Sequence, residues 1–504
     1  MSDNVPEYEK DFLQCLLKNN TSLKAASDFI NIQRNHNIYN FQHTAQELLG
    51  RQHDCTSNVK FTQYNVLKDN VSVNALGSNI FTHVIDLMQK QELQYCLHKL
   101  YDNSCISNIL TGEIAKWHFD EVNLHQPANT YILFLQIYSD KSSIDLLNRK
   151  MMWPFYLTCA SLSDNLRHTS DARRHIGFFP VFHGEQQLPV YQRVLEWLLQ
   201  PLIQFQDKPF PFKLINGEMI NVVIRVIGTP VDLPETYLMS CLKFSPLTFQ
   251  PCHLCHIPRE HLSNIYPNGG IGNNTYRTRE EMKNIYDARN KEDATANSMH
   301  MYPSALWNLL VPNHYQLASI DVLHMFHKGF ALYIYKYIVN FWIKTLPNYK
   351  KLLQRLNTVF NNMLPFPGMK HFTRADKLPK ITGHEMKLFM LIFDVALNGL
   401  LISVGSYTNR QLKEEHALVL LIMAYNEYYD AITTVTESLT DVFKRHVSSL
   451  GRVLHERLMS SPIFQYSPSQ WKTIKVIIHT CFTYIYIFLI ICIINYRFTV
   501  FFVI

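Results

Sequence analysis

Four hydrophobic runs of strand length lie in the second quarter of the chain. They are Tyr131–Tyr138, Trp153–Cys159, His175–Phe182 and Val222–Thr229. Short runs rich in β-branched and aromatic side chains predict strands. Residues 189–205, between the third and fourth runs, carry apolar positions at helical spacing and predict an amphipathic helix. The resulting order, β-β-β-α-β, predicts an α/β core.

The remainder of the chain shows other patterns. Residues 1–125 mix short apolar clusters with polar stretches, which indicates a helical and irregular region. The first part of the core, residues 126–250, precedes a loop-rich and then helical insertion at residues 251–375. Residues 376–446 again show helical spacing, and residues 447–504 form a hydrophobic tail. The expected helices of the C-terminal half are Ile320–Trp342, His384–Leu401 and Glu414–Phe443.

The composition indicates a large intracellular protein of more than one domain. The 504 residues are 47% hydrophobic, which is enough to bury a sizeable core. The 47 Lys and Arg residues exceed the 41 Asp and Glu residues, and this net charge of +6 permits contact with nucleic acid without requiring it. The 10 cysteines are scattered and the acidic N-terminus lacks an apolar signal core, so we expect a reducing compartment.

Two acidic residues directly follow predicted strands, and a third begins a predicted helix. Asp140 follows the first strand, Asp232 follows the fourth, and Glu385 lies near the start of a helix. Pro234 suits the first turn of a helix after Asp232. Three converging carboxylates can hold two Mg²⁺ or Mn²⁺ ions, which polarise the attacking and leaving oxygens of a phosphodiester. An ordinary helix-capping or solvated role is the alternative for each acid.

A series of short motifs runs in order from about Trp117 to about His446. They are Ile137–Lys141, Trp153–Thr158, the pair Arg173 and Arg174, Val231–Glu235, Cys252–Cys255, Ile320–Gly329, Gly368–Phe372 and Ile381–Lys387. In this order and spacing they resemble the motifs of Plavaka-type transposases, a group of the CACTA-like, or KDZ, superfamily. The resemblance implies an α/β fold with a ribonuclease H-like core, in which flanking helices cover a mixed sheet and a largely helical insertion interrupts the domain.

The same resemblance implies an activity and a site. Asp140, Asp232 and Glu385 stand at the positions of the three acids of a DDE transposase. The chain is then expected to cleave and rejoin double-stranded DNA at transposon ends with two Mg²⁺ or Mn²⁺ ions, in the nucleus and as a homo-oligomer. Asp321 and His324 lie about one helical turn apart, and they offer an acid and base, a DNA contact or a structural hydrogen bond. Asp321 is also an alternative second metal ligand, although Asp232 is favoured because it ends a predicted strand.

A pair of cysteines lies in the loop-rich segment. Cys252 and Cys255 have the two-residue gap that lets both thiolates bind one zinc ion. His256 and His261 are the nearest candidates for the other two ligands. The alternative is an inert pair of loop cysteines.

Basic residues flank the predicted strands. Lys141, Arg167, Arg173 and Arg174 are candidates for contacts with DNA phosphates, which position DNA without reading its sequence. A solvated basic surface is the alternative.

Both ends of the chain differ from the pattern that the family resemblance implies. Plavaka-type relatives extend further in both directions, so we expect a truncated protein, and a catalytically inactive relic that retains DNA binding is one alternative function. The apolar run Val476–Tyr496 is long enough to cross a bilayer, which makes a tail-anchored membrane protein another alternative. Translation of A/T-rich non-coding sequence after a truncation would give the same composition, and this interpretation is favoured.

Overall fold

A computed structural model describes the parts of the chain that carry most of the predicted elements. The described residues are 62–68, 71–90, 93, 97, 113–143, 151–162, 164–167, 169, 172–181, 184, 187–245, 247–261, 275–317, 323–362, 374, 383–433 and 440–463. The chain divides into two compact units, residues 1–62 and 63–504, and all described residues except Thr62 belong to the second. The apolar run at 476–496 lies outside the described residues.

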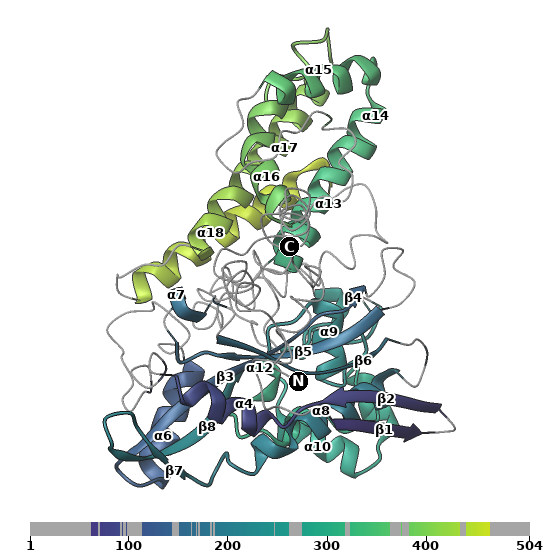
Figure 1. The fold of residues 1–504 in the computed structure, drawn as a ribbon. Helices are drawn as coiled ribbons and strands as arrows, with labels where there is room; N and C mark the ends of the chain where they lie inside the picture. Colours follow the sequence, from purple (N-terminus) through teal and green to yellow (C-terminus); the bar gives the residue numbers. More distant parts are fainter. Residues whose placement is uncertain are drawn as a thin grey trace, which may run out of the picture. The chain divides into compact units, whose positions relative to one another are not determined.

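One mixed β-sheet forms the core of the α/β part (Figure 1). Its strands are β1 (Thr62–Lys68), β2 (Val71–Gly77), β3 (Thr130–Ser139), β4 (Ser142–Ser143), β5 (Met151–Cys159), β6 (Arg173–Pro180), β7 (Phe210–Lys213) and β8 (Met219–Gly228). Their spatial order is β1-β2-β6-β5-β3-β8-β7, and β4 pairs with β5. Strand β3 is antiparallel to β5 and parallel to β8. The four predicted strands are therefore confirmed as β3, β5, β6 and β8.

The two central strands β3 and β8 are buried on both faces. In β3, Phe134 belongs to one hydrophobic cluster, whereas its neighbours Leu133 and Leu135 belong to another. In β8, Val223 and Val222 divide between the same two clusters. Successive side chains of a strand point to opposite faces, so a strand buried on both faces needs an unbroken apolar run. This requirement explains why both strands read as continuous hydrophobic segments.

Helices cover both faces of the sheet. They are α4 (Ile80–Met88) and α8 (Gln187–Ile203) on one face and α6 (Glu113–His125) on the other. Helix α8 confirms the amphipathic helix predicted at residues 189–205, and it buries apolar side chains along its length. A further short helix, α7 (Asp164–Arg167), precedes β6.

Residues 62–77 form two strands where the sequence pattern had indicated helical or irregular structure. Strand β2 pairs with β6, and Gly77 lies opposite Gly177. A Cβ atom on Gly77 would lie 2.5 Å from the ring of Trp197 in α8, so the close packing of helix on sheet requires glycine there. Val73 and Ala75 are buried and Asn74 between them is exposed, which gives the period of two that a strand with one buried face requires.

Short elements follow β8. They are α9 (Leu233–Met239), η3 (Arg259–His261), α10 (Arg279–Asp287), α11 (Lys291–Ala296), η4 (Ala305–Asn308) and α12 (His314–Leu317). All of them except η3 contribute to a small hydrophobic cluster of their own. Arg277 is fully buried and donates hydrogen bonds to three backbone carbonyl oxygens, of Gln250, Cys252 and Asn297. This one side chain therefore holds the loop between α9 and α10 in place.

From Leu323 onward the described residues are mainly helical. The helical elements are η5 (Leu323–Ala331), α13 (Leu332–Tyr335), η6 (Lys336–Trp342), α14 (Ile343–Thr345), α15 (Tyr349–Asn362), α16 (Gly383–Leu397), α17 (Asn409–Thr433) and α18 (Thr440–Ser460). The helix predicted from Ile320 is confirmed from Leu323 onward, with π-helical turns in η5 and η6. The single helix predicted at Glu414–Phe443 is wrong in one respect, because α17 ends at Thr433 and α18 begins at Thr440.

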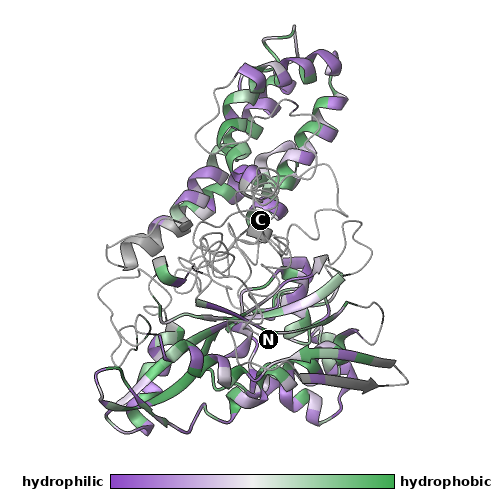
Figure 2. Cartoon of the chain, in the orientation of Figure 1, coloured by the Kyte–Doolittle hydropathy of each residue, from purple (hydrophilic) through white to green (hydrophobic). Residues whose placement is uncertain are grey.

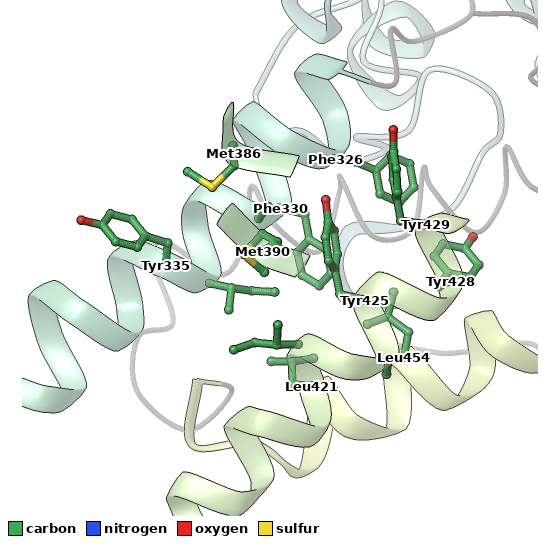
Figure 3. Close-up of a cluster of buried hydrophobic side chains, with 14 of the residues drawn as sticks. Phe326, Phe330, Tyr335, Met386, Met390, Leu421, Tyr425, Tyr428, Tyr429 and Leu454 are labelled. Atoms are coloured by element: carbon green, nitrogen blue, oxygen red, sulfur yellow. The ribbon is translucent and has the colours of Figure 1, made fainter. Parts of the chain in front are cut away.

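Aromatic and aliphatic side chains hold these helices together. Figure 3 shows Phe326 and Phe330 beside Tyr425 and Tyr429, which come from η5 and α17. In Figure 2 hydrophobic and hydrophilic residues both occur along α15, as expected of an amphipathic helix. Among the helices that the structure describes, none is both long enough and apolar enough to cross a bilayer.

Candidate active site

Strands β3 and β8 bring the first two predicted acids to one edge of the sheet. The two strands are parallel, so their C-terminal ends lie at the same edge. Gln136 of β3 pairs with Gly228 of β8, and Asp140 and Asp232 each lie four residues beyond their member of this pair. Both acidic side chains are half-buried. The convergence of these two acids follows directly from the strand register.

Asp232 is the N-cap residue of α9. Its Oδ1 accepts a hydrogen bond of 2.8 Å from the backbone N–H of Glu235. Pro234 lies in the first turn, where the missing N–H would have had no partner within the helix. The cap occupies one carboxylate oxygen, and a divalent cation requires only the other. The capping and metal-binding interpretations of Asp232 are therefore compatible.

Glu235 is a third carboxyl group at this edge, and the sequence pattern did not single it out. Its side chain is 1% exposed and accepts a hydrogen bond of 2.6 Å from Tyr191 Oη of α8. Burial raises the pKa of Glu235 to about 8, and the charges of Asp232 and Asp140 add to the rise, whereas the hydroxyls of Ser139 and Tyr191 oppose it. The charges of both strand-end acids therefore raise the pKa of one buried carboxyl group, which agrees with the register of the sheet.

Aromatic and basic side chains border Asp140. Tyr138 Oη donates to Asp140 Oδ2 at 3.4 Å. Burial, followed by the negative charge of Asp140, raises the pKa of the Tyr156 hydroxyl. Lys141 Nζ lies 4.8 Å from the centroid of the Trp153 ring, in a cation–π contact. Lys141 is thereby held close to the acid edge.

The basic residues predicted to contact phosphates differ in their accessibility. Arg167 is 1% exposed and donates to a backbone carbonyl oxygen at 2.9 Å, so the predicted phosphate contact does not fit its burial. Arg174 forms an ion pair of 2.6 Å with Asp86 of α4. Arg173 is half-buried, and burial lowers its pKa. Lys141 remains the best candidate, because Nε and Nη2 of Arg173 are buried and Arg174 already binds the Asp86 carboxylate.

The third predicted acid belongs to the helical half. Glu385 lies in the first turn of α16 and is half-buried. Two positions further, Lys387 Nζ lies 5.3 Å from the centroid of the Tyr429 ring. Asp321 and the side chain of His324 fall outside the described residues. The approach of Glu385 to the strand-end acids stays a prediction, and the described residues include no group of three or more His, Cys, Asp or Glu side chains arranged to hold a metal.

The two cysteines of the Cys-x-x-Cys motif lie close together and are fully buried. The backbone N–H of Leu254 donates to Cys252 Sγ at 3.4 Å. A hydrogen bond with Cys252, together with burial, raises the pKa of the Cys255 thiol, and the backbone of Ile257 opposes this rise. Cys252 Sγ thus receives a backbone donor, whereas the raised pKa of Cys255 favours its neutral thiol.

The two histidines proposed to complete a zinc site are differently placed. His256 has Gln250 Oε1 at 2.8 Å from Nδ1 and Glu281 Oε2 at 2.9 Å from Nε2, so both ring nitrogens are engaged. His261 ends the short helix η3 and is exposed. The structure therefore brings the cysteines together but does not bring either histidine to them as a ligand.

Comparison with known proteins identifies the family. The family model for Plavaka transposase matches residues 19–338, well over half of the chain. The matched region contains Asp140, Asp232 and the cysteine pair, and it ends before Glu385. A comparison with curated proteins found no match. The strand-end acids and the extent of the family match lead to one conclusion: the chain belongs to the Plavaka transposase family.

Proposed function

We propose that this protein is a DDE-type enzyme that uses divalent metal ions to cut DNA at transposon ends and to join the cut ends to target DNA. The observation that carries the proposal is the placement of Asp140 and Asp232 at one edge of the sheet. Glu235 supports the proposal, because the charges of both acids raise the pKa of its buried carboxyl group. Carboxylate oxygens are the ligands that Mg²⁺ and Mn²⁺ prefer.

We also propose a ribonuclease H-like core for the sheet region. Support comes from the mixed sheet, from its β-β-β-α-β succession of main elements and from helices on both faces. The acids then occupy the C-terminal ends of the first and fourth strands of that succession. Glu385 is the proposed third ligand, carried by a helix in the C-terminal half.

Each residue of the site has a distinct proposed role. Divalent ions bound here would polarise the attacking and leaving oxygens of the phosphodiester, first for water and then for a DNA 3′-hydroxyl. Asp140 and the free oxygen of Asp232 hold the cations at the sheet edge. Lys141 neutralises phosphate charge beside Asp140, and Arg173 of β6 is a further proposed phosphate contact. Family membership implies DNA binding, and we propose a nuclear location and action as a homo-oligomer.

The full chain is expected to nick plasmid DNA that carries the sequences flanking its own coding region, in the presence of Mg²⁺ or Mn²⁺ but not of EDTA. Asp140→Asn should lower the nicking rate by about a thousandfold, because the amide keeps the shape but loses the charge that attracts the cation. Agarose-gel conversion of supercoiled to open-circular plasmid measures the rate.

Asp120→Asn is the matched control. Asp120 is an exposed acid on α6, and its substitution removes the same charge away from the sheet edge. A folded wild-type chain that binds this DNA without cutting it would contradict the proposal and would favour the inactive relic. Equal losses for both variants would show that net charge, and not the site, controls nicking.

We propose, as a separate point, that Cys252 and Cys255 are two ligands of a structural zinc ion. The backbone N–H donated to Cys252 Sγ supports this, and the two remaining ligands are not supplied by His256 or His261 in the described arrangement. Purified full chain is expected to contain stoichiometric zinc by elemental mass spectrometry, and Cys252→Ser should lose it. The exposed His261→Ala is the control and should retain the metal; a zinc-free wild type identifies an inert pair.

A further inference from the structure

Helix α9, which carries Asp232, is too short to fix its own orientation. It spans seven residues, and Asp232 is tied to its first turn by three hydrogen bonds. These are the bonds of 2.8 Å from Glu235 N to Asp232 Oδ1, 2.9 Å from Thr236 N to Asp232 O and 3.0 Å from Thr236 Oγ1 to Asp232 O. The direction of the Asp232 carboxylate therefore depends on what holds the first turn of α9.

Neighbouring residues of α8 anchor the two ends of α9. At the N-terminal end, Tyr191 Oη donates to Glu235 Oε1 at 2.6 Å. At the C-terminal end, Gln192 Nε2 donates to the carbonyl oxygens of Leu238 at 2.5 Å and Met239 at 3.1 Å. Tyr191 and Gln192 are both buried. The first anchor lies beside the acids, and the second lies at the far end of the helix.

The first anchor also faces the end of β3. Ser139, the last residue of that strand, is fully buried, and its hydroxyl lies near enough to the Tyr191–Glu235 pair to lower the pKa of both groups. Asp140 follows Ser139 directly. The buried pair thus contacts both segments that carry the acids, and a buried carboxyl group beside two others is costly unless it is held by hydrogen bonds.

We propose that Tyr191 and Glu235 position the Asp232 carboxylate against Asp140, which makes Glu235 a positioning residue of the metal site and not a metal ligand. This inference rests on the proposed metal-dependent function. Groups that orient metal ligands from outside typically change metal affinity or activity by about 10–100-fold when they are altered. Gln192 provides a structural comparison, because it holds the same helix without facing the acids.

The test measures Mn²⁺ binding to the full chain by electron paramagnetic resonance, without DNA, alongside nicking. Tyr191→Phe removes the donor and Glu235→Ala removes the acceptor, and each should weaken Mn²⁺ binding by about 10–100-fold. Glu235→Gln keeps an acceptor for Tyr191, so its Mn²⁺ affinity should stay within about threefold of wild type. If Glu235 were a metal ligand, Glu235→Gln would lose as much Mn²⁺ affinity as Asp140→Asn. Gln192→Leu should lower the melting temperature without changing Mn²⁺ affinity.

The outcomes separate the inference from the proposed function. A Tyr191→Phe variant that binds Mn²⁺ with wild-type affinity overturns the positioning role. A Gln192→Leu variant that loses as much Mn²⁺ affinity as Tyr191→Phe overturns it too. A Glu235→Gln variant that loses as much Mn²⁺ affinity as Asp140→Asn also overturns it. A wild-type chain that binds Mn²⁺ but does not nick DNA contradicts the proposed function alone. A chain that binds no Mn²⁺ overturns both.

Discussion

Asp232→Asn is expected to lower metal-dependent nicking by about a thousandfold while leaving the fold intact. Asparagine caps helices about as well as aspartate, so the hydrogen bond to the N–H of Glu235 survives the substitution. Only the negative charge that attracts the cation is lost. Nicking rates and circular dichroism melting curves of wild type and variant measure the two parts of this expectation.

Asp321→Asn decides between the two candidates for the second metal ligand. Asp232 is favoured because the parallel pairing of β3 with β8 puts it at the same edge as Asp140. A thousandfold loss in Asp321→Asn, with near-normal nicking by Asp232→Asn, would reverse this assignment. Asp232→Ala should melt at a lower temperature than Asp232→Asn, because alanine loses the cap at a cost of about 1 kcal/mol.

Glu121→Leu is expected to destabilise the protein by about 3–5 kcal/mol, because it leaves a buried cation without its partner. Arg225 of β8 is fully buried at its side chain, and its Nη2 lies 3.0 Å from Glu121 Oε2 of α6. The Glu121 side chain is 19% exposed, so water screens this pair poorly. Urea denaturation of the full chain, followed by fluorescence, measures the free energy of unfolding.

The double variant Glu121→Leu/Arg225→Met tests the cause of this loss. Replacing both members of a buried ion pair by apolar residues of similar size is often neutral, so the double variant should recover most of the stability. A double variant as unstable as Glu121→Leu would show that packing, and not the ion pair, is responsible. Asp120→Leu, at an exposed neighbouring position of α6, should change stability by no more than about 0.5 kcal/mol.

The sequence predicted best those elements whose hydrophobic pattern directly reflects how they are buried. Strands β3 and β8 need apolar residues on both faces, so their runs were unmistakable, and the acids that follow them were found by position. Strands β1 and β2 were missed because a strand with one buried face keeps polar residues at alternate positions and so gives no continuous hydrophobic run. Val73 and Ala75, separated by the exposed Asn74, carry that period of two within β2.

Residues whose role depends on tertiary burial could not be assigned from the sequence. Glu235 reads as an ordinary acid in a first helical turn, and only the approach of Tyr191 from α8 distinguishes it. Arg167 reads as a surface cation, yet its guanidinium binds a backbone carbonyl oxygen in the interior. His256 has a plausible ligand spacing, but Gln250 and Glu281 engage both of its ring nitrogens. In each case the deciding neighbour lies on another element or loop.

The parallel pairing of β3 with β8 also affects when the site can form during synthesis of the chain. Thr130 pairs with Asn221, about ninety residues later, and the ladder ends only at Gly228. Contacts between such distant segments form late, because a long loop must close before they contribute stability. A ribosome-bound chain that has released β3, β5 and β6 can form their antiparallel pairs, but Asp140 has no partner acid until Asp232 has emerged. We therefore expect the nascent protein to acquire its fold in stages, with the two strand-end acids brought together late and the proposed third ligand, Glu385, added later still.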